Sequence, residues 1–325
     1  MWLFLDIFGY LTVILHGAAL TAQALTVGGI AAWSLLARPL AVEVDRPLRR
    51  LLAWSALALA LVSLGDLALR IATLGGTTRL TIAEAVGAGF ALALGAKALA
   101  ALVVALLCWG HRGVAGGLMA LLAALLIAAA TGTTHAVARS DGRALLALAS
   151  ALHMAAAAVW IGGIPYFLMA LARTADGVHL GRIGKRFSAM AMASVATLIA
   201  TGTIMAVNYL GSLEALYGTA YGLMVMGKIT LLAMLLLLGA MNFRLVDRFR
   251  GDAATPLLRL RRFAEAEIGI GMTLFFAAAS LTSIPPGVDL DRDRVSLADM
   301  AARLTPKWPS FETPSHADLA IPAMQ

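Results

Sequence analysis

Eight long apolar runs constrain what this 325-residue chain can fold into. A helix of about 20 apolar residues is long enough to cross the hydrocarbon core of a lipid bilayer. Only 13% of the residues are charged, whereas soluble domains carry about 25%. We therefore predict an all-α, polytopic membrane protein with eight transmembrane helices, near residues 8–36, 50–74, 85–109, 114–136, 146–171, 187–210, 220–244 and 264–284.

Lys and Arg residues are distributed unevenly among the loops between these spans. The first, third, fifth and seventh loops carry 15 of them, and the even-numbered loops carry 3. Because positively charged loops stay on the cytoplasmic side, both termini are predicted to lie outside the cytoplasm. The same loops account for the net charge of +7, so we expect no nucleic-acid partner. Residues 286–325 would form a proline-rich extracytoplasmic tail.

The two halves of the sequence resemble each other. His16 is followed by Gly28-Gly29, and later His153 is followed by Gly162-Gly163. An even number of helices in each half predicts a parallel duplication, as in some transporters. The expected units are an N-terminal four-helix half, residues 1–140, and a C-terminal four-helix half, residues 141–285. Further matches support this division: Arg49-Arg50 with Lys185-Arg186, Gly65 with Gly202, and Lys97 with Lys228.

Three histidines fall in the outer layer of the predicted bilayer. His16 and His153 lie in the outer halves of inward-running spans, and His135 ends the fourth span. An intramembrane ionisable side chain is a functional-site hypothesis by default, and imidazole suits copper, zinc, iron and nickel. We therefore predict a metal site formed by His16, His135 and His153. The alternative is that each histidine only hydrogen-bonds a neighbouring helix and stabilises packing.

Softer or apolar side chains near this layer could support a metal site. Met154, Met205 and Met226 lie toward the outer side of the second half, and thioethers favour Cu(I). Methionine is also ordinary apolar packing in a membrane helix. Trp160 lies two helical turns after His153, so we expect it to form a wall of the site.

Two lysines lie well inside apolar spans. Lys97 and Lys228 must pair, reach the interface or lose their charge there. Asp66 and Arg70 have the i, i+4 spacing of a helical ion pair, and Asp66 could instead reach Lys97. A structural pair and a role in an ion or proton path are both open for these lysines.

Several signatures of other protein classes are missing from the sequence. It has no phosphate-binding glycine loop and no HExxH pair, and its one cysteine, Cys108, excludes an intramolecular disulfide and a cysteine-cluster metal site. We expect no ATP-driven pump and no enzyme.

A series of short matches begins at His153 and its Trp160-Ile161-Gly162-Gly163 turn. It continues with Thr201-Gly202, Tyr221-Gly222 leading to Lys228, and Asn242 followed by Arg244, and His135 precedes it. Over roughly residues 130–285 the sequence resembles the copper resistance protein D (CopD) family.

The resemblance implies a multi-pass protein of the bacterial inner membrane that transports copper or maintains its level. It implies metal handling at His135 and His153; His16 rests on the repeat alone. A separate periplasmic CopC-like copper-binding partner is expected with the copper ion and the lipid bilayer. Copper would move from the periplasm toward the cytoplasm between the two halves.

Two other functions fit the same residues. One is a b-type haem protein that transfers electrons, although haem needs axial histidines facing each other and only one half could supply such a pair. The other is an assembly factor that metallates an enzyme. Such a factor needs no continuous polar path, and the intramembrane lysines argue against it.

Overall fold

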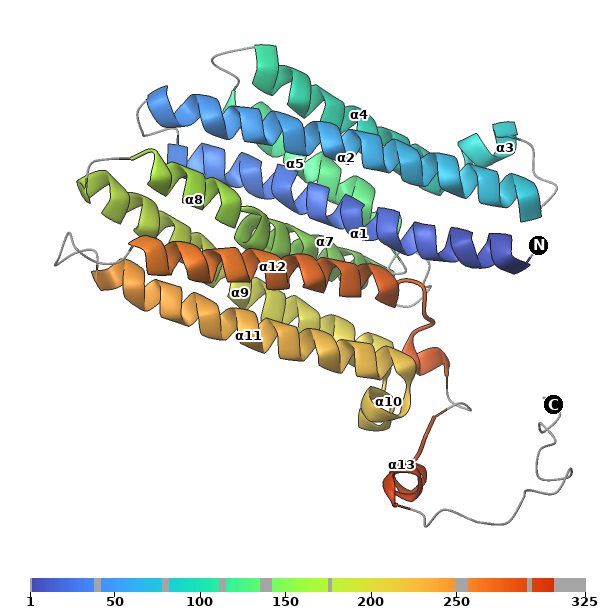
Figure 1. Cartoon of the computed structure of the whole chain (residues 1–325). Helices are drawn as coiled ribbons and strands as arrows, with labels where there is room; N and C mark the ends of the chain where they lie inside the picture. The colour runs from blue at the N-terminus through green and yellow to red at the C-terminus, as the bar shows by residue number, and fades with distance from the viewer. Residues whose placement is uncertain are drawn as a thin grey trace, which may run out of the picture.

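The computed structural model describes residues 2–37, 42–77, 82–110, 115–134, 142–174, 177–248, 257–290 and 294–306. Helices joined by short turns make up these residues, and none of them forms a β-strand. The long helices lie side by side along one common direction (Figure 1). The predicted all-α class is therefore confirmed for the described part of the chain.

Seven helices among the described residues are long and apolar enough to cross a membrane. They coincide with seven of the eight predicted spans to within several residues. One of them bends through a π-helix, η2, before it continues. The helices are α1 (Trp2–Ala32, extended by η1, Trp33–Ala37), α2 (Val42–Thr77), α4 (Gly89–Gly110), α7 (Arg143–Ala157) with η2 (Ala158–Gly162) and α8 (Ile164–Ala172), α9 (Gly177–Leu210), α11 (Ala220–Arg248) and α12 (Leu257–Leu281).

The predicted fourth span, 114–136, is a shorter helix, α5 (Gly116–Thr131), of 16 residues. At 1.5 Å per residue it is about 24 Å long, less than the roughly 30 Å of hydrocarbon. The helix ends because the backbone changes to i, i+3 bonds at Thr133 and Thr134, and their hydroxyls donate to carbonyls three residues back. The fold therefore has seven long apolar helices and one short one, and eight complete spans remain a prediction.

Short helices lie at the ends of the long ones. They are α3 (Ile82–Gly87), α10 (Leu213–Gly218), η3 (Gly287–Asp289) and α13 (Leu297–Leu304). The backbone N–H of Val295 donates to the carbonyl of Gly218 (3.0 Å), which ties the segment after α12 to α10. The start of α1, the end of α12 and α13 lie toward the same end of the bundle (Figure 1).

Glycines allow the closest helix contact, which joins α1 to η2. A Cβ on Gly28 would fall on the backbone of Ala158 and Gly162, and a Cβ on Gly162 would fall on Ala24. Small residues let membrane helices approach to backbone contact. The glycine pairs that the repeat singles out therefore meet each other at the centre of the bundle.

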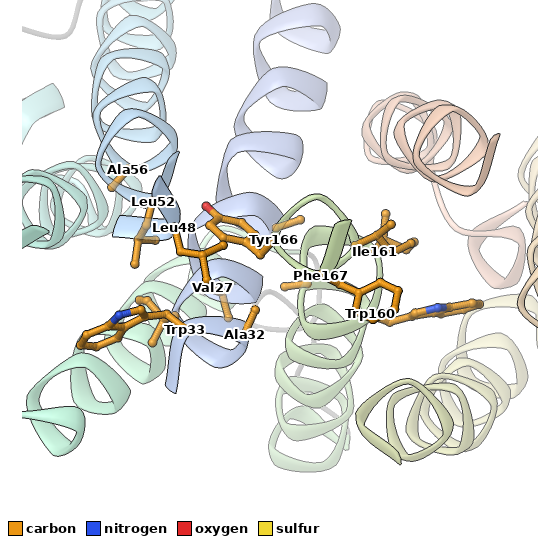
Figure 2. Packing of buried hydrophobic residues seen from close by; sticks show 14 of the residues in the cluster. Val27, Ala32, Trp33, Leu48, Leu52, Ala56, Trp160, Ile161, Tyr166 and Phe167 are labelled. Carbon is orange, nitrogen blue, oxygen red and sulfur yellow. The ribbon is translucent and has the colours of Figure 1, made fainter. Parts of the chain in front are cut away.

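Pro165 explains the π-helix that precedes it. Proline has no backbone N–H to donate to the carbonyl four residues earlier, and its ring crowds that carbonyl. The helix therefore widens into the π-helical turn η2 before α8 begins. Single π-helical turns of this kind occur mostly as bulges within α-helices. Around this bend the core is tight: Tyr166 is fully buried and points toward Leu48 and Leu52 of α2, whereas Trp160 points away from them (Figure 2).

Candidate metal site

His153 has a defined hydrogen-bond partner on the neighbouring helix. Its Nδ1 lies 3.0 Å from the Thr201 hydroxyl oxygen of α9. That hydroxyl is 2.6 Å from the carbonyl of Thr197. A threonine hydroxyl has one proton, and the shorter contact assigns it to Thr197. Thr201 therefore accepts from His153 Nδ1–H, and this tautomer leaves Nε2 with a free lone pair, the arrangement that a metal-binding histidine needs.

Gly202 lies beside the His153 ring. A Cβ placed on Gly202 would be 3.5 Å from Cε1 and 3.9 Å from Nδ1 of His153. The imidazole therefore lies beside two consecutive residues of α9, next to the hydroxyl of Thr201 and the backbone of Gly202. His153 lies in the first half of the span Arg143–Ala172, as the sequence predicts.

Lys228 of α11 is the charged group that acts on His153. Its side chain is only partly exposed. Because like charges repel, an ammonium here opposes a metal cation at His153. The charge of Lys228 therefore disfavours a positive charge on His153, and a supporting role of Lys228 at a metal site stays a prediction.

His16 lies in a different polar environment. The charges of Lys97, Asp66 and Arg70 act on it, and Asp66 and Lys97 are only 1% and 4% exposed. Asp66 forms the predicted i, i+4 ion pair with Arg70, at 2.9 Å. His16 thus has a carboxylate and two cations nearby, whereas the charge that acts on His153 is that of Lys228.

The predicted three-histidine cluster remains a prediction. His135 lies outside the described residues. Within the described ranges, no group of three or more His, Cys, Asp or Glu side chains is arranged to hold a metal ion. His16 and His153 lie on α1 and α7, which pack against each other.

The predicted supporting residues have separate surroundings. Met154 packs against the main core, Met205 against a second cluster that contains Tyr209 and Tyr221, and Met226 is 43% exposed. Trp160 is 3% exposed, and a Cβ on Gly239 of α11 would be 3.7 Å from its ring. The methionines are thus spread over different environments, and Trp160 fills the core between α11 and η2.

One buried polar pair was not predicted from the sequence. Glu267 of α12 is 3% exposed, and Asn242 of α11 donates a hydrogen bond from Nδ2 to its Oε1. Glu267 was overlooked because it stands near the predicted start of its span, where a charged residue is expected to meet water. Its spacing from small residues was overlooked: Ala264 lies three residues before Glu267 and Gly271 four residues after it. This spacing places Glu267 on the same helix face as these two residues.

Known proteins resemble part of this chain. Residues 181–281 match the family model of copper resistance protein D (CopD). The resemblance read from the sequence is confirmed over this range, which contains Thr201, Lys228 and Glu267.

A curated relative is similar over a limited stretch. Over 137 residues, 41% of this chain, the sequence is 30% identical to copper transport protein CutJ of Bacillus subtilis (strain 168). The match covers 24% of CutJ, so the chain spans only a minor part of that relative. No solved structure matches the chain.

Proposed function

We propose that this protein transports copper across the bacterial inner membrane, from the periplasm toward the cytoplasm. The observation that carries the proposal is the His153–Thr201 hydrogen bond, which leaves the second imidazole nitrogen free inside a membrane helix. The match of residues 181–281 to CopD and the similarity to a copper transport protein support copper as the cargo. A transporter, rather than an enzyme, is what these residues favour.

In this proposal His153 receives the ion in the outer half of the membrane. Thr201 holds the imidazole in the tautomer that presents Nε2. Lys228 repels the bound cation and keeps its residence short, since conduction requires binding weak enough for the ion to leave. His135, His16 and the methionines are proposed as further sites along the path, with a CopC-like protein delivering copper from outside.

The two halves are proposed to be related by duplication, with both termini outside the cytoplasm. The matched glycines both face the first helix of their own half: Gly65 of α2 lies beside Leu15 of α1, and Gly202 of α9 lies beside His153 of α7. The glycine pairs at 28–29 and 162–163 meet across the centre, as expected for residues exchanged by a pseudo-twofold axis. The N-terminal half would then carry a copy of the His–Lys arrangement to which Asp66 and Arg70 have been added.

Metal analysis and an optical spectrum of the detergent-purified protein test this function. We expect a protein without a haem spectrum that retains copper, and loss of that copper in His153→Ala. His179→Ala, at the opposite end of the bundle on α9, is the matched control and should retain it. A haem spectrum in the purified protein would favour the electron-transfer alternative, and unchanged copper in His153→Ala would refute the site.

A further inference from the structure

Glu267 lies on the buried face of α12. The buried residues of this helix recur at three- and four-residue intervals, which defines one face of a helix: Leu260, Ala264, Glu267, Phe275 and Ala279, with Gly271 between them. A Cβ on Gly271 would fall on the side chain of Ile161 in η2. The carboxyl group of Glu267 therefore belongs to the face that packs into the bundle, not to the lipid-facing side.

Within the described structure, no positively charged side chain acts on this carboxyl group. Among the described residues, the ion pair of this helix is formed by Arg261 and Glu265 (2.8 Å), both exposed. The elements packed against α12 are α1, α8, η2 and α11. None of their titratable or charged side chains acts on Glu267: those described are Tyr10 and His16 on α1, Tyr166 on α8, and Tyr221, Lys228 and Arg244 on α11.

Asn242 provides the second observation. Its Nδ2 donates to Glu267 Oε1, while its Oδ1 is buried and, within the described structure, has no hydrogen-bond partner. A buried acceptor without a donor is costly. If Glu267 carries a proton, its hydroxyl can donate to Asn242 Oδ1, and acid and amide then form two hydrogen bonds. If the Asn242 amide is rotated by 180°, its Oδ1 instead of its Nδ2 contacts Glu267 Oε1. Two oxygen atoms in contact need a proton between them, so Glu267 is again protonated.

A carboxylate buried in a membrane protein without a positively charged partner is unfavourable unless a proton or another cation accompanies it. Oxygen ligands suit hard ions, whereas copper(I) prefers softer donors, so a proton is the better occupant. Asn242 lies near the end of the span Ala220–Leu245 and Glu267 in the first half of the span Leu258–Leu281. In the proposed orientation, both lie toward the cytoplasmic side.

We propose that Glu267 is a proton-binding site that couples copper movement to proton release on the cytoplasmic side. This inference rests on the proposed transport function. When a copper ion enters the inner half of the bundle, the O–H bond of the Glu267 carboxyl breaks and the proton passes to cytoplasmic water. The bonding electrons stay on the carboxylate, whose negative charge compensates one positive charge of the ion. No oxidation or reduction is involved.

The first experiment needs no copper. Infrared difference spectroscopy on the protein in lipid detects the carbonyl stretch of a protonated carboxyl group. We expect this band in the unmodified protein and its loss in Glu267→Gln. The matched control is Glu265→Gln, two residues earlier in the same helix, where the side chain is exposed; this variant should retain the band. A band of equal intensity in Glu267→Gln would overturn the proposal.

The second experiment measures copper movement into proteoliposomes that contain a pH-sensitive dye. In the unmodified protein and Glu265→Gln, copper movement should depend on the pH at the cytoplasmic face, and protons should be released there as copper moves. Glu267→Gln should lose both responses while it still retains copper at His153, which also shows that it is folded. An unchanged pH response in Glu267→Gln overturns the coupling alone. If the unmodified protein moves no copper, the proposed function fails and the coupling with it, although the infrared band would persist.

Discussion

Thr201→Val tests whether the Thr201 hydroxyl prepares His153 for metal binding. Valine has nearly the shape of threonine, so the substitution removes the hydroxyl with little change in packing. The His153 ring, whose Nδ1 lies 3.0 Å from the Thr201 hydroxyl oxygen, would keep only its hydrogen bond to the backbone of Leu198. The ring would then turn or exchange tautomers, and Nε2 would no longer be presented in one fixed orientation.

The expected magnitude follows from the cost of losing such a contact. Removal of an outer hydrogen-bond partner of a metal-binding histidine weakens metal affinity by about 10- to 100-fold. A tenfold change corresponds to about 1.4 kcal/mol, so we expect a loss of about 1.4–2.8 kcal/mol. This is within the range for leaving one buried donor unsatisfied, about 1–3 kcal/mol.

The measurement is a competition titration of the purified protein against a chelator of known copper affinity. Thr203→Val is the matched control, because the Thr203 hydroxyl donates the same kind of bond to the preceding helical turn, at the Ile199 carbonyl (2.8 Å), and Thr203 is exposed. It should bind copper like the unmodified protein, and so should Thr201→Ser, which keeps the hydroxyl. A Thr201→Val affinity within about twofold of Thr203→Val would refute the reasoning, since the expected loss is at least tenfold.

Three further predictions concern charge, packing and the segment after α12. Lys228→Met should tighten copper binding by about fivefold, on the order of 1 kcal/mol, in the same titration; weaker binding would mean that Lys228 does not repel the ion. Gly28→Leu should destabilise the protein by at least 1–3 kcal/mol, roughly the cost of overpacking, whereas Gly269→Leu, with nothing within 4 Å of an added Cβ, should melt like the unmodified protein. Hydrogen bonds from Ser296 lower the pKa of Asp299, and both residues form the capping box of α13. The capping box therefore stabilises α13 fully at a pH above the usual pKa of a carboxyl group. This stabilisation is lost as the pH falls through the lowered pKa. The protection of the α13 amides against hydrogen exchange, measured relative to the intrinsic exchange rate at each pH, should therefore decrease at acidic pH, and Asp299→Asn should remove this pH dependence.

The long helices could be predicted from the sequence because their signal is local. Hydropathy over about 20 residues locates each span, and seven of the eight predicted spans coincide with long helices. The Asp66–Arg70 pair was predictable for the same reason, since i, i+4 spacing alone brings the two side chains together. The end of α5 at Thr131 was not predicted, because a hydropathy window does not register that the hydroxyls of Thr133 and Thr134 bond to the preceding turn.

Contacts between helices could not be predicted in this way. The partner of His153 is 48 residues away, and the rotation of α7 relative to α9 is set by packing across the bundle. Helix rotation likewise decides that Met226 is exposed while Met154 packs against the core, although the sequence predicts both toward the outer side. Glu267 was missed for this reason, because its burial depends on the face that α12 turns toward η2.

The most direct test of copper transport through the His153 site is copper uptake by proteoliposomes. Protein is reconstituted, copper is added outside, and the copper that enters the lumen is measured over time for the unmodified protein, His153→Ala and the His179→Ala control. The account predicts uptake by the unmodified protein and the control, and uptake at the level of protein-free vesicles for His153→Ala. Equal uptake by His153→Ala and the control would contradict it.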